Sequence, residues 1–181
     1  MPRPVREPFH LALVGLPGAG KTTVARSLAR ELAWPMLDFD EEIERREGRA
    51  IARIFEESGE DYFRARERDV TAELTDAGPT ILSPGGGWIT RSGTVDLIRN
   101  RTRLVWLRVS PGAAIRRMGG NRSARPLLMK GEPEAILARL EAERARFYAG
   151  SDAAINTEVL TQQQVVLQIG QLASFWGARV G

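Results

Sequence analysis

The sequence lacks cysteine altogether and contains only one histidine, His10, and two lysines among its 181 residues. The absence of cysteine excludes disulfide bonds and thiolate chemistry, and a single histidine argues against a histidine-based catalytic triad or a zinc site. No apolar run approaches the roughly 20 residues that span a bilayer, and the N-terminal residues lack the hydrophobic core of a signal peptide. These absences lead us to expect a cytoplasmic protein that does not bind membranes.

The chain also lacks a strong excess of charge. It has 26 basic and 23 acidic residues, which gives a net charge of +3, and its pI of 9.9 mostly reflects the high pKa of arginine. Without a dense basic tract, nucleic acid is not an expected partner. A length of 181 residues, 43% of them hydrophobic and 27% charged, suits a single domain over residues 1–181 with a substantial core. We expect this domain to act as a monomer.

Three glycines lie close together in residues 13–25, which read LVGLPGAGKTTVA. The segment fits the pattern G-x-x-x-x-G-K-[ST], with the fixed positions at Gly15, Gly20, Lys21 and Thr22. An apolar run at residues 10–14 predicts a strand before it, and apolar residues at every fourth position predict a helix after it. Glycines let several backbone N–H groups point at one anion, and the helix N-terminus adds partial positive charge. We therefore expect a phosphate-binding loop at residues 15–23, with Lys21 on the β- and γ-phosphates and Thr22 on Mg²⁺; a plain glycine turn is the alternative.

Short apolar segments alternate with helical patterns along the rest of the chain. The predicted strands are residues 10–14, 35–39, 80–83, 103–109 and 153–156, and the predicted helices are residues 22–33, 61–76, 92–100, 111–118, 132–149 and 161–176. Such alternation predicts an α/β fold of three layers, with a five-stranded parallel sheet flanked by helices. Residues 40–60 and 119–131 do not fit the alternation. Because insertions in such a sheet often carry function, we expect one to bind the acceptor and the other to close over the nucleotide.

Two aspartates stand at the end of the second predicted strand. Asp38 and Asp40 flank Phe39, and because side chains alternate along a strand, both carboxylates are expected on one face. They lie at the carboxyl end of the strand, where ligands bind in open α/β sheets. One carboxylate is then expected near Mg²⁺ and the other near the attacking hydroxyl. The alternative is that both belong to the acidic start of a helix, because Glu41 and Glu42 follow.

Residues 54–70, IFEESGEDYFRARERDV, place an arginine beside a glutamate on a predicted helix. Arg64 and Glu67 are three positions apart and are therefore neighbours. The pair is either an ordinary surface salt bridge or an arginine that its acidic partner holds ready for a carboxylate ligand. On aromatic character alone, Phe55 and Phe63 are expected in the core.

Three consecutive glycines, Gly85, Gly86 and Gly87, follow the third predicted strand. Three flexible residues in a row are costly in chain entropy, and a plain turn would need fewer of them. The pattern favours a backbone that approaches a ligand closely, with a simple turn as the alternative.

Taken in order, these motifs resemble those of the shikimate kinases, a nucleoside-monophosphate-kinase-like group of P-loop kinases, over nearly the whole chain. The motifs are GLPGAGKTT at 15–23, DFD at 38–40, the IF, GE, FR and E positions of 54–67, GGG at 85–87, the RR, GGN and RPLL positions of 116–128, and Arg144 with Tyr148. Outside the phosphate loop each motif alone is weak, but the ordered set is specific.

The resemblance implies ATP, Mg²⁺ and shikimate as ligands. The implied ATP-binding residues are Gly15, Pro17, Gly18, Ala19, Gly20, Lys21, Thr22, Thr23, Arg117, which stacks on adenine, and Arg125. The implied shikimate-binding residues are Asp40, Phe55, Phe63, Arg64, Glu67, Gly85, Gly86, Gly87 and Arg144, within an acceptor-binding insertion at 40–69 and two later segments. Thr22 and Asp38 are implied for the metal, and Lys21, Asp40 and Arg125 for catalysis. Arg125 belongs to a mobile lid at 119–131, where Arg122 is the alternative.

The predicted function is transfer of the γ-phosphoryl group of ATP to the 3-hydroxyl of shikimate, a step in chorismate and aromatic amino-acid biosynthesis. One alternative is a related small-molecule kinase such as a gluconate kinase, and another is a non-catalytic, ligand-sensing domain of the same fold. Arg64, Arg144 and the DFD motif favour a compact carboxylate with ring hydroxyls, and the intact catalytic positions favour an enzyme. Three glutamines at 162–164 match no position with an assignable role.

Overall fold

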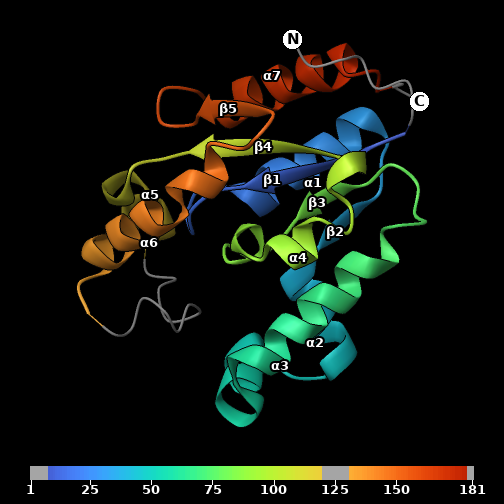
Figure 1. Cartoon of the computed structure of the whole chain (residues 1–181). Coiled ribbons are helices and arrows are strands. Elements are labelled where there is room, and N and C mark those ends of the chain that lie inside the picture. The colour runs from blue at the N-terminus through green and yellow to red at the C-terminus, as the bar shows by residue number, and fades with distance from the viewer. Residues whose placement is uncertain (1–7, 120–130, 179–181) are drawn as a thin grey trace.

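The computed structural model of the chain describes residues 8–119 and 131–178. Its centre is a sheet of five parallel strands in the order β2-β3-β1-β4-β5 (Figure 1). The strands are β1 (His10–Val14), β2 (Met36–Asp38), β3 (Ile81–Ser83), β4 (Thr102–Arg108) and β5 (Ala153–Asn156). The predicted five-stranded parallel sheet is therefore confirmed.

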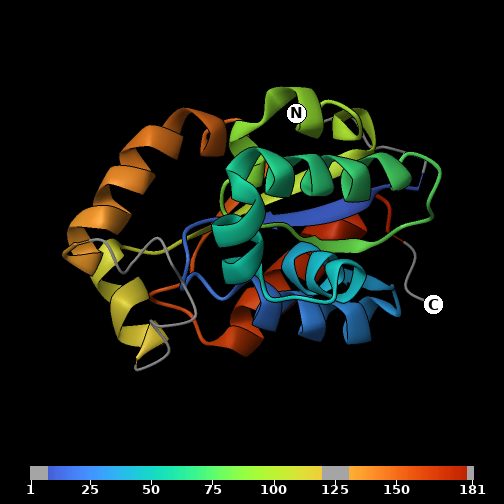
Figure 2. The same cartoon turned by 90° about the horizontal axis from the view of Figure 1, so that it is seen from below.

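Helices cover both faces of the sheet (Figures 1 and 2). They are α1 (Lys21–Leu32), α2 (Phe39–Glu47), α3 (Ile51–Glu73), α4 (Ser92–Val95), α5 (Pro111–Met118), α6 (Pro133–Tyr148) and α7 (Gln162–Phe175), with short 3₁₀ turns at Trp88–Thr90 and Arg99–Arg101. Within the described residues, no helix has the length and apolar character needed to cross a membrane.

The predicted helix at residues 92–100 is wrong. α4 ends at Val95, and a separate 3₁₀ turn precedes β4. The four residues of α4 include Gly93 and two β-branched residues, all of which have low helix propensity. Ile98, which is fully buried, then fixes the path of the chain toward the sheet by packing into the core.

The side chains of β1 show why the sheet needs helices on both faces. Leu11 and Leu13 pack into one hydrophobic cluster, with α1 and α7, while Ala12 and Val14 pack into the other, which α3 covers. Successive side chains of a strand point to opposite faces, so a strand that is apolar throughout is buried on both. This arrangement places β1 in the middle of the sheet and the loop that follows it at the sheet's carboxyl edge.

The acceptor-binding insertion predicted at residues 40–69 consists of α2 and most of α3. α3 is two helices that meet at Gly59, where φ is 82° and ψ is 173°. A left-handed φ of this kind strains any residue with a side chain, which explains the glycine. The second part of α3 packs Phe63 and Val70 against the sheet, and the first part projects away from it with α2 (Figure 1).

Candidate active site

The predicted phosphate loop joins the end of β1 to the start of α1. A Cβ at Gly15 would lie 2.6 Å from the carbonyl oxygen of Leu107, and one at Gly18 would lie 2.6 Å from that of Ala114. Gly20 has open space around it but a φ of 90°. Gly20 is also the N-cap of α1 and offers no side-chain hydrogen bond to the first turn. The N–H groups at the start of α1 are thus left for an anion, as in other phosphate-binding helices.

Lys21 is the first residue of α1 and bends back over the loop. Its Nζ donates hydrogen bonds to the carbonyl oxygens of Gly15, at 2.9 Å, and Leu16, at 3.0 Å. These contacts hold the ammonium group within the curve of the loop. A cation and a helix N-terminus therefore face the same space, which suits the phosphates of a nucleotide.

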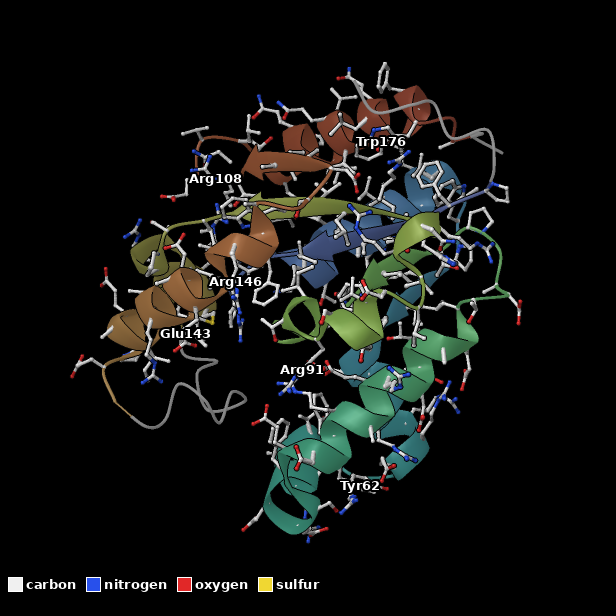
Figure 3. The ribbon with its side chains drawn as sticks, viewed as in Figure 1. Tyr62, Arg91, Arg108, Glu143, Arg146 and Trp176 are labelled. Carbon is white, nitrogen blue, oxygen red and sulfur yellow. The ribbon has the colours of Figure 1, made fainter. Side chains whose placement is uncertain are left out.

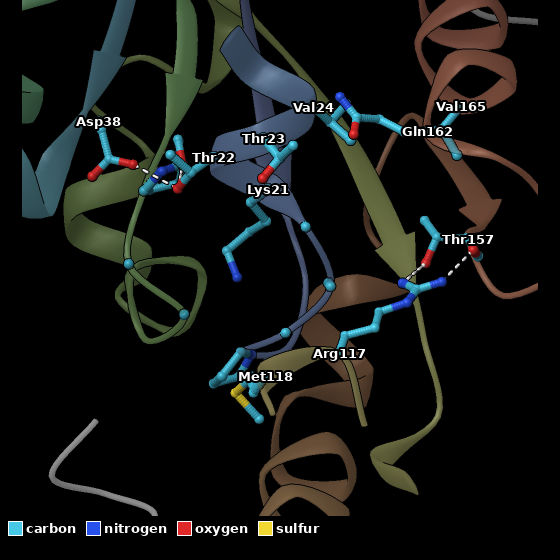
Figure 4. Close-up of a pocket in the computed structure, with 18 of the residues that line it drawn as sticks. Lys21, Thr22, Thr23, Val24, Asp38, Arg117, Met118, Thr157, Gln162 and Val165 are labelled. Atoms are coloured by element: carbon cyan, nitrogen blue, oxygen red, sulfur yellow. Dashed lines mark hydrogen bonds between the residues drawn. The ribbon is translucent and has the colours of Figure 1, made fainter. Parts of the chain in front are cut away.

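Thr22, Asp38 and Ser83 bring three oxygen-bearing side chains together at the ends of α1, β2 and β3. The Thr22 hydroxyl donates to Oδ2 of Asp38 at 2.8 Å and lies 3.2 Å from Oγ of Ser83. Figure 4 shows Thr22 and Asp38 joined by this hydrogen bond at the edge of the cavity. Ser83 was not predicted, although it is the polar end of an apolar strand.

The prediction that Asp38 and Asp40 share a strand face is wrong. β2 ends at Asp38, and Phe39 begins α2. Oδ1 of Asp38 accepts hydrogen bonds from the backbone N–H groups of Asp40, at 3.1 Å, and Glu41, at 3.2 Å, so it is the N-cap of that helix. The alternative interpretation, in which both aspartates belong to the acidic start of a helix, agrees with the local structure. Both aspartates nevertheless line one cavity.

This cavity has a volume of about 800 Å³ and runs from the predicted acceptor insertion to α7 (Figure 4). The phosphate loop lines its middle. Residues lining the acceptor end are Asp38, Asp40, Ser83, Pro84, Gly85 and Gly86; those lining the opposite end are Arg117, Met118, Thr157, Leu160, Gln162 and Val165. A volume of this size is typical of sites that bind small molecules and cofactors.

Arg64 and Glu67 form the ion pair that their spacing predicts. Nη1 of Arg64 donates to Oε2 of Glu67 at 2.6 Å, and the Glu67 side chain is only 2% exposed. Burial raises the pKa of Glu67 to about 6, although the charge of Arg64 opposes that rise. Oε1 of Glu67 has no hydrogen-bond partner within the described residues. The pair is therefore not an ordinary surface salt bridge.

Glu60 holds the other edge of the Arg64 guanidinium. Nε and Nη2 of Arg64 donate to Oε1 of Glu60, at 3.2 and 3.1 Å. Arg91, at the start of α4 (Figure 3), donates to the same oxygen at 3.1 Å. The guanidinium also lies over the Phe63 ring, 5.2 Å from its centroid. Arg64 is thus fixed by a carboxylate on each side and by a buried ring.

Phe55 and Phe63 pack against each other, with ring centroids 4.8 Å apart. Phe63 is 3% exposed and Phe55 partly buried, and both belong to the hydrophobic cluster under α3. Their core role follows from aromatic character, and Phe63 also supports the guanidinium described above.

The three glycines of the 85–87 loop lie directly against charged side chains. A Cβ at Gly85 would come within 3.0 Å of Glu67, one at Gly86 within 2.8 Å of Arg144, and one at Gly87 within 2.6 Å of Arg64. None of the three has a positive φ, so turn geometry does not require glycine here. Glycine is required because these charged side chains leave no room for a Cβ. The triple glycine lets two guanidinium groups approach one short backbone segment.

Arg144, on α6, is 7% exposed, and its Nη1 has no hydrogen-bond partner within the described residues. A buried guanidinium nitrogen without a partner is unusual, because desolvation without a hydrogen bond is costly. The unsatisfied donor lies beside Gly86, at the acceptor end of the site. An anionic ligand there would satisfy it.

Arg117 lies at the opposite end of the cavity, on α5. It donates hydrogen bonds to Thr157, through Nη1 to the hydroxyl at 2.8 Å and through Nη2 to the carbonyl oxygen (Figure 4). Thr157 in turn donates to the carbonyl oxygen of Arg108 at 2.9 Å. Sequence analysis did not identify Thr157, whose signal was only its place just after the fifth strand. Of the predicted lid, residues 120–130, which include Arg122 and Arg125, lie outside the described residues.

Comparison with known proteins agrees with this geometry. A sequence profile of the shikimate kinase family matches residues 17–173. Shikimate kinase of Moorella thermoacetica is 37% identical over 169 residues, covering 93% of this chain and 96% of its own. That of Thermobifida fusca is 47% identical over 137 residues, covering 75% and 77%. The structure of shikimate kinase from Acinetobacter baumannii in complex with shikimate superimposes with a TM-score of 0.87 at 35% identity, covering 96% of this chain and 97% of that one.

Proposed function

This chain belongs to the shikimate kinase family, and we propose that it transfers the γ-phosphoryl group of ATP to the 3-hydroxyl of shikimate. The products are shikimate 3-phosphate and ADP. The observation that carries the proposal is the convergence of Arg64 and Arg144 on the 85–87 loop, at the end of the cavity beyond the phosphate loop. Two guanidinium groups so close together suit a single carboxylate.

Asp40 lies beside this pair and is assigned to the acceptor hydroxyl. Its Oδ1 lies 3.3 Å from the position of a Cβ on Gly85, so a ring held by its carboxylate at the two arginines would present its hydroxyls to Asp40. During transfer, the hydroxyl oxygen forms a bond to the γ-phosphorus, the bond to the β,γ-bridging oxygen breaks, and the hydroxyl proton passes to Asp40. Asp40 thus orients the nucleophile and takes its proton.

Lys21 and the first N–H groups of α1 are assigned to the phosphates. Charge that develops on the transferring group is stabilised by donors that are already in place, because the loop carbonyls hold Lys21 before any ligand arrives. Arg125 is assigned a similar role from the sequence alone. Arg117, held by Thr157 at the far end of the cavity, is assigned to the adenine ring.

The residues present fit a magnesium ion. Thr22 and Asp38 offer a hydroxyl and a carboxylate oxygen to the same point at the mouth of the phosphate loop. Within the described residues there is no cluster of three or more His, Cys, Asp or Glu side chains that could enclose a metal. This suits Mg²⁺, which is commonly held by one or two protein oxygens together with substrate phosphates and water. The ion would neutralise phosphate charge.

The decisive experiment measures ADP formation with shikimate, gluconate or a nucleoside monophosphate, each supplied separately as the acceptor. We expect turnover that depends on shikimate. Turnover with gluconate alone would indicate the related small-molecule kinase, whose open-chain acceptor does not require the compact Arg64 and Arg144 arrangement. Shikimate binding without turnover would indicate a ligand-sensing domain. The monomeric state and the cytoplasmic location remain predictions.

A further inference from the structure

The nucleobase end of the cavity carries a polar group that the proposed reaction does not use. With the acceptor at the Asp40 end and the phosphates on the loop, the base must lie between α5 and α7. Arg117 can stack on any base, and Met118, Leu160 and Val165 supply apolar surface. Gln162, at the start of α7, is the remaining polar side chain that extends toward α1 there (Figure 4). A carboxamide, which carries both a hydrogen-bond donor and an acceptor, can distinguish one purine from another by hydrogen bonding.

The carboxamide of Gln162, an exposed residue, is oriented by one hydrogen bond to α1. Its Nε2 donates to Oγ of Ser27 at 3.0 Å. The Ser27 hydroxyl has one proton, which it donates to the carbonyl oxygen of Thr23 at 3.3 Å. With its proton directed to Thr23, Ser27 accepts from Gln162, and the NH₂ group of the carboxamide faces Ser27. The carboxamide oxygen, which has no partner within the described residues, is left as an acceptor.

We infer that Gln162 is a specificity-determining residue that selects adenine over guanine. The inference rests on the proposed function, which places a nucleoside triphosphate in this cavity. Adenine carries an amino donor at the position where guanine carries a carbonyl acceptor. The oxygen of Gln162 complements that amino group and repels the guanine carbonyl. Ser27 acts as a positioning residue, because its hydrogen bond to Nε2 favours the orientation that leaves the carboxamide oxygen for the base.

The other two glutamines of the 162–164 run have different roles. Gln164 forms a capping box with Thr161, in which each side chain bonds to the backbone N–H of the other. Gln163 is exposed, as Gln162 is, but it is not among the residues that line the cavity. Gln163 therefore provides a matched control on the same helix.

The test measures kcat/KM for ATP and for GTP at saturating shikimate, and ADP and GDP binding by calorimetry. Gln162→Leu should lower the preference for the adenine nucleotide by roughly 3- to 10-fold, mainly through KM, which is the usual effect of one lost hydrogen bond. Ser27→Ala should also lower it, chiefly by improving GTP and GDP, because the carboxamide becomes free to turn. Gln163→Leu should leave the ratio unchanged.

The inference is overturned if Gln162→Leu keeps the wild-type ratio of adenine to guanine nucleotides, or if Gln163→Leu changes it equally. Calorimetry separates this result from failure of the proposed function. If shikimate is not phosphorylated, the preference for ADP over GDP and its loss in Gln162→Leu still decide the role of Gln162. Thermal melting of each variant verifies that the protein is folded.

Discussion

The role of Lys21, which the backbone of the phosphate loop holds in place, can be tested by a single substitution. Lys21→Met removes the ammonium group that two loop carbonyls hold in place. The variant should fold normally but lose about 10²–10³ in kcat, the usual loss for one preorganised electrostatic contact. Steady-state kinetics and thermal melting check this prediction. Retention of more than roughly a tenth of wild-type kcat would contradict the role of Lys21.

Asp38 and Asp40 should respond differently when changed to asparagine. Asp40→Asn should collapse kcat, because a carboxamide cannot take the hydroxyl proton. Asp38→Asn should raise the Mg²⁺ concentration needed for activity and leave α2 intact, because asparagine is also a good N-cap. Activity measured across a Mg²⁺ titration distinguishes the two. Rescue of Asp40→Asn by Mg²⁺, without rescue of Asp38→Asn, would mean that the roles are reversed.

Glu67 should make the free energy of unfolding depend on pH. Its pKa is about 6 in the folded protein, against an ordinary value of 4.5, so the folded state binds this proton more tightly than the unfolded chain. The stabilisation is fully present below pH 4.5 and is lost as the pH rises through 6. The difference corresponds to about 2 kcal/mol. Denaturant unfolding between pH 4 and 7 should show this loss in the wild type relative to Glu67→Gln; parallel curves would refute it.

At the scale of elements, the 85–87 loop gives the sharpest prediction. Gly86→Ala would place a methyl group 2.8 Å from Nη1 of Arg144, without backbone strain, since its φ is not positive. We expect KM for shikimate to rise by about tenfold or more, the cost of losing one charge-assisted hydrogen bond, while the melting temperature changes little. Gly78→Ala, which has open space around it, is the control. Equal kinetics for the two variants would show that the loop does not position Arg144.

Local patterns predicted most elements but not their limits. The phosphate loop and the five strands could be predicted because glycine spacing and apolar runs are short-range signals. The end of β2 could not, because the side chain of Asp38 turns the chain by capping α2. The contact of Arg117 with Thr157, 40 positions away, depends on strand order. Likewise Ser27 meets Gln162 only because α1 and α7 pack on one face of the sheet.

At the scale of the whole molecule, the proposed sites for ATP and shikimate share one cavity whose halves meet at the phosphate loop. A Cβ at Gly86 would lie 3.8 Å from the carbonyl oxygen of Gly15, so the backbones of the two halves lie side by side. We expect a non-hydrolysable ATP analogue to tighten shikimate binding by roughly 5- to 150-fold, and shikimate to tighten the analogue by the same factor. Calorimetric titration of each ligand, with and without the other, measures both factors.

The same titrations test the assignment of Arg125, which rests on the sequence. Arg125→Ala should lose most of this coupling together with kcat, and Arg122→Ala should lose little of either. Independent binding of the two ligands in the wild type, or a larger loss from Arg122→Ala, would contradict the assignment.

The strand order also determines when the sheet can form during synthesis on the ribosome. β1 precedes the other strands of the described residues along the chain and lies between β3 and β4, with Leu11 paired to Ile81 and His10 to Thr102. Until both partners have emerged, β1 has an unpaired edge and the loop after it has no scaffold. Pairings this distant along the chain also slow folding. A nascent chain that stops before Thr102 is therefore expected to be a target for chaperones and proteases rather than a weaker enzyme.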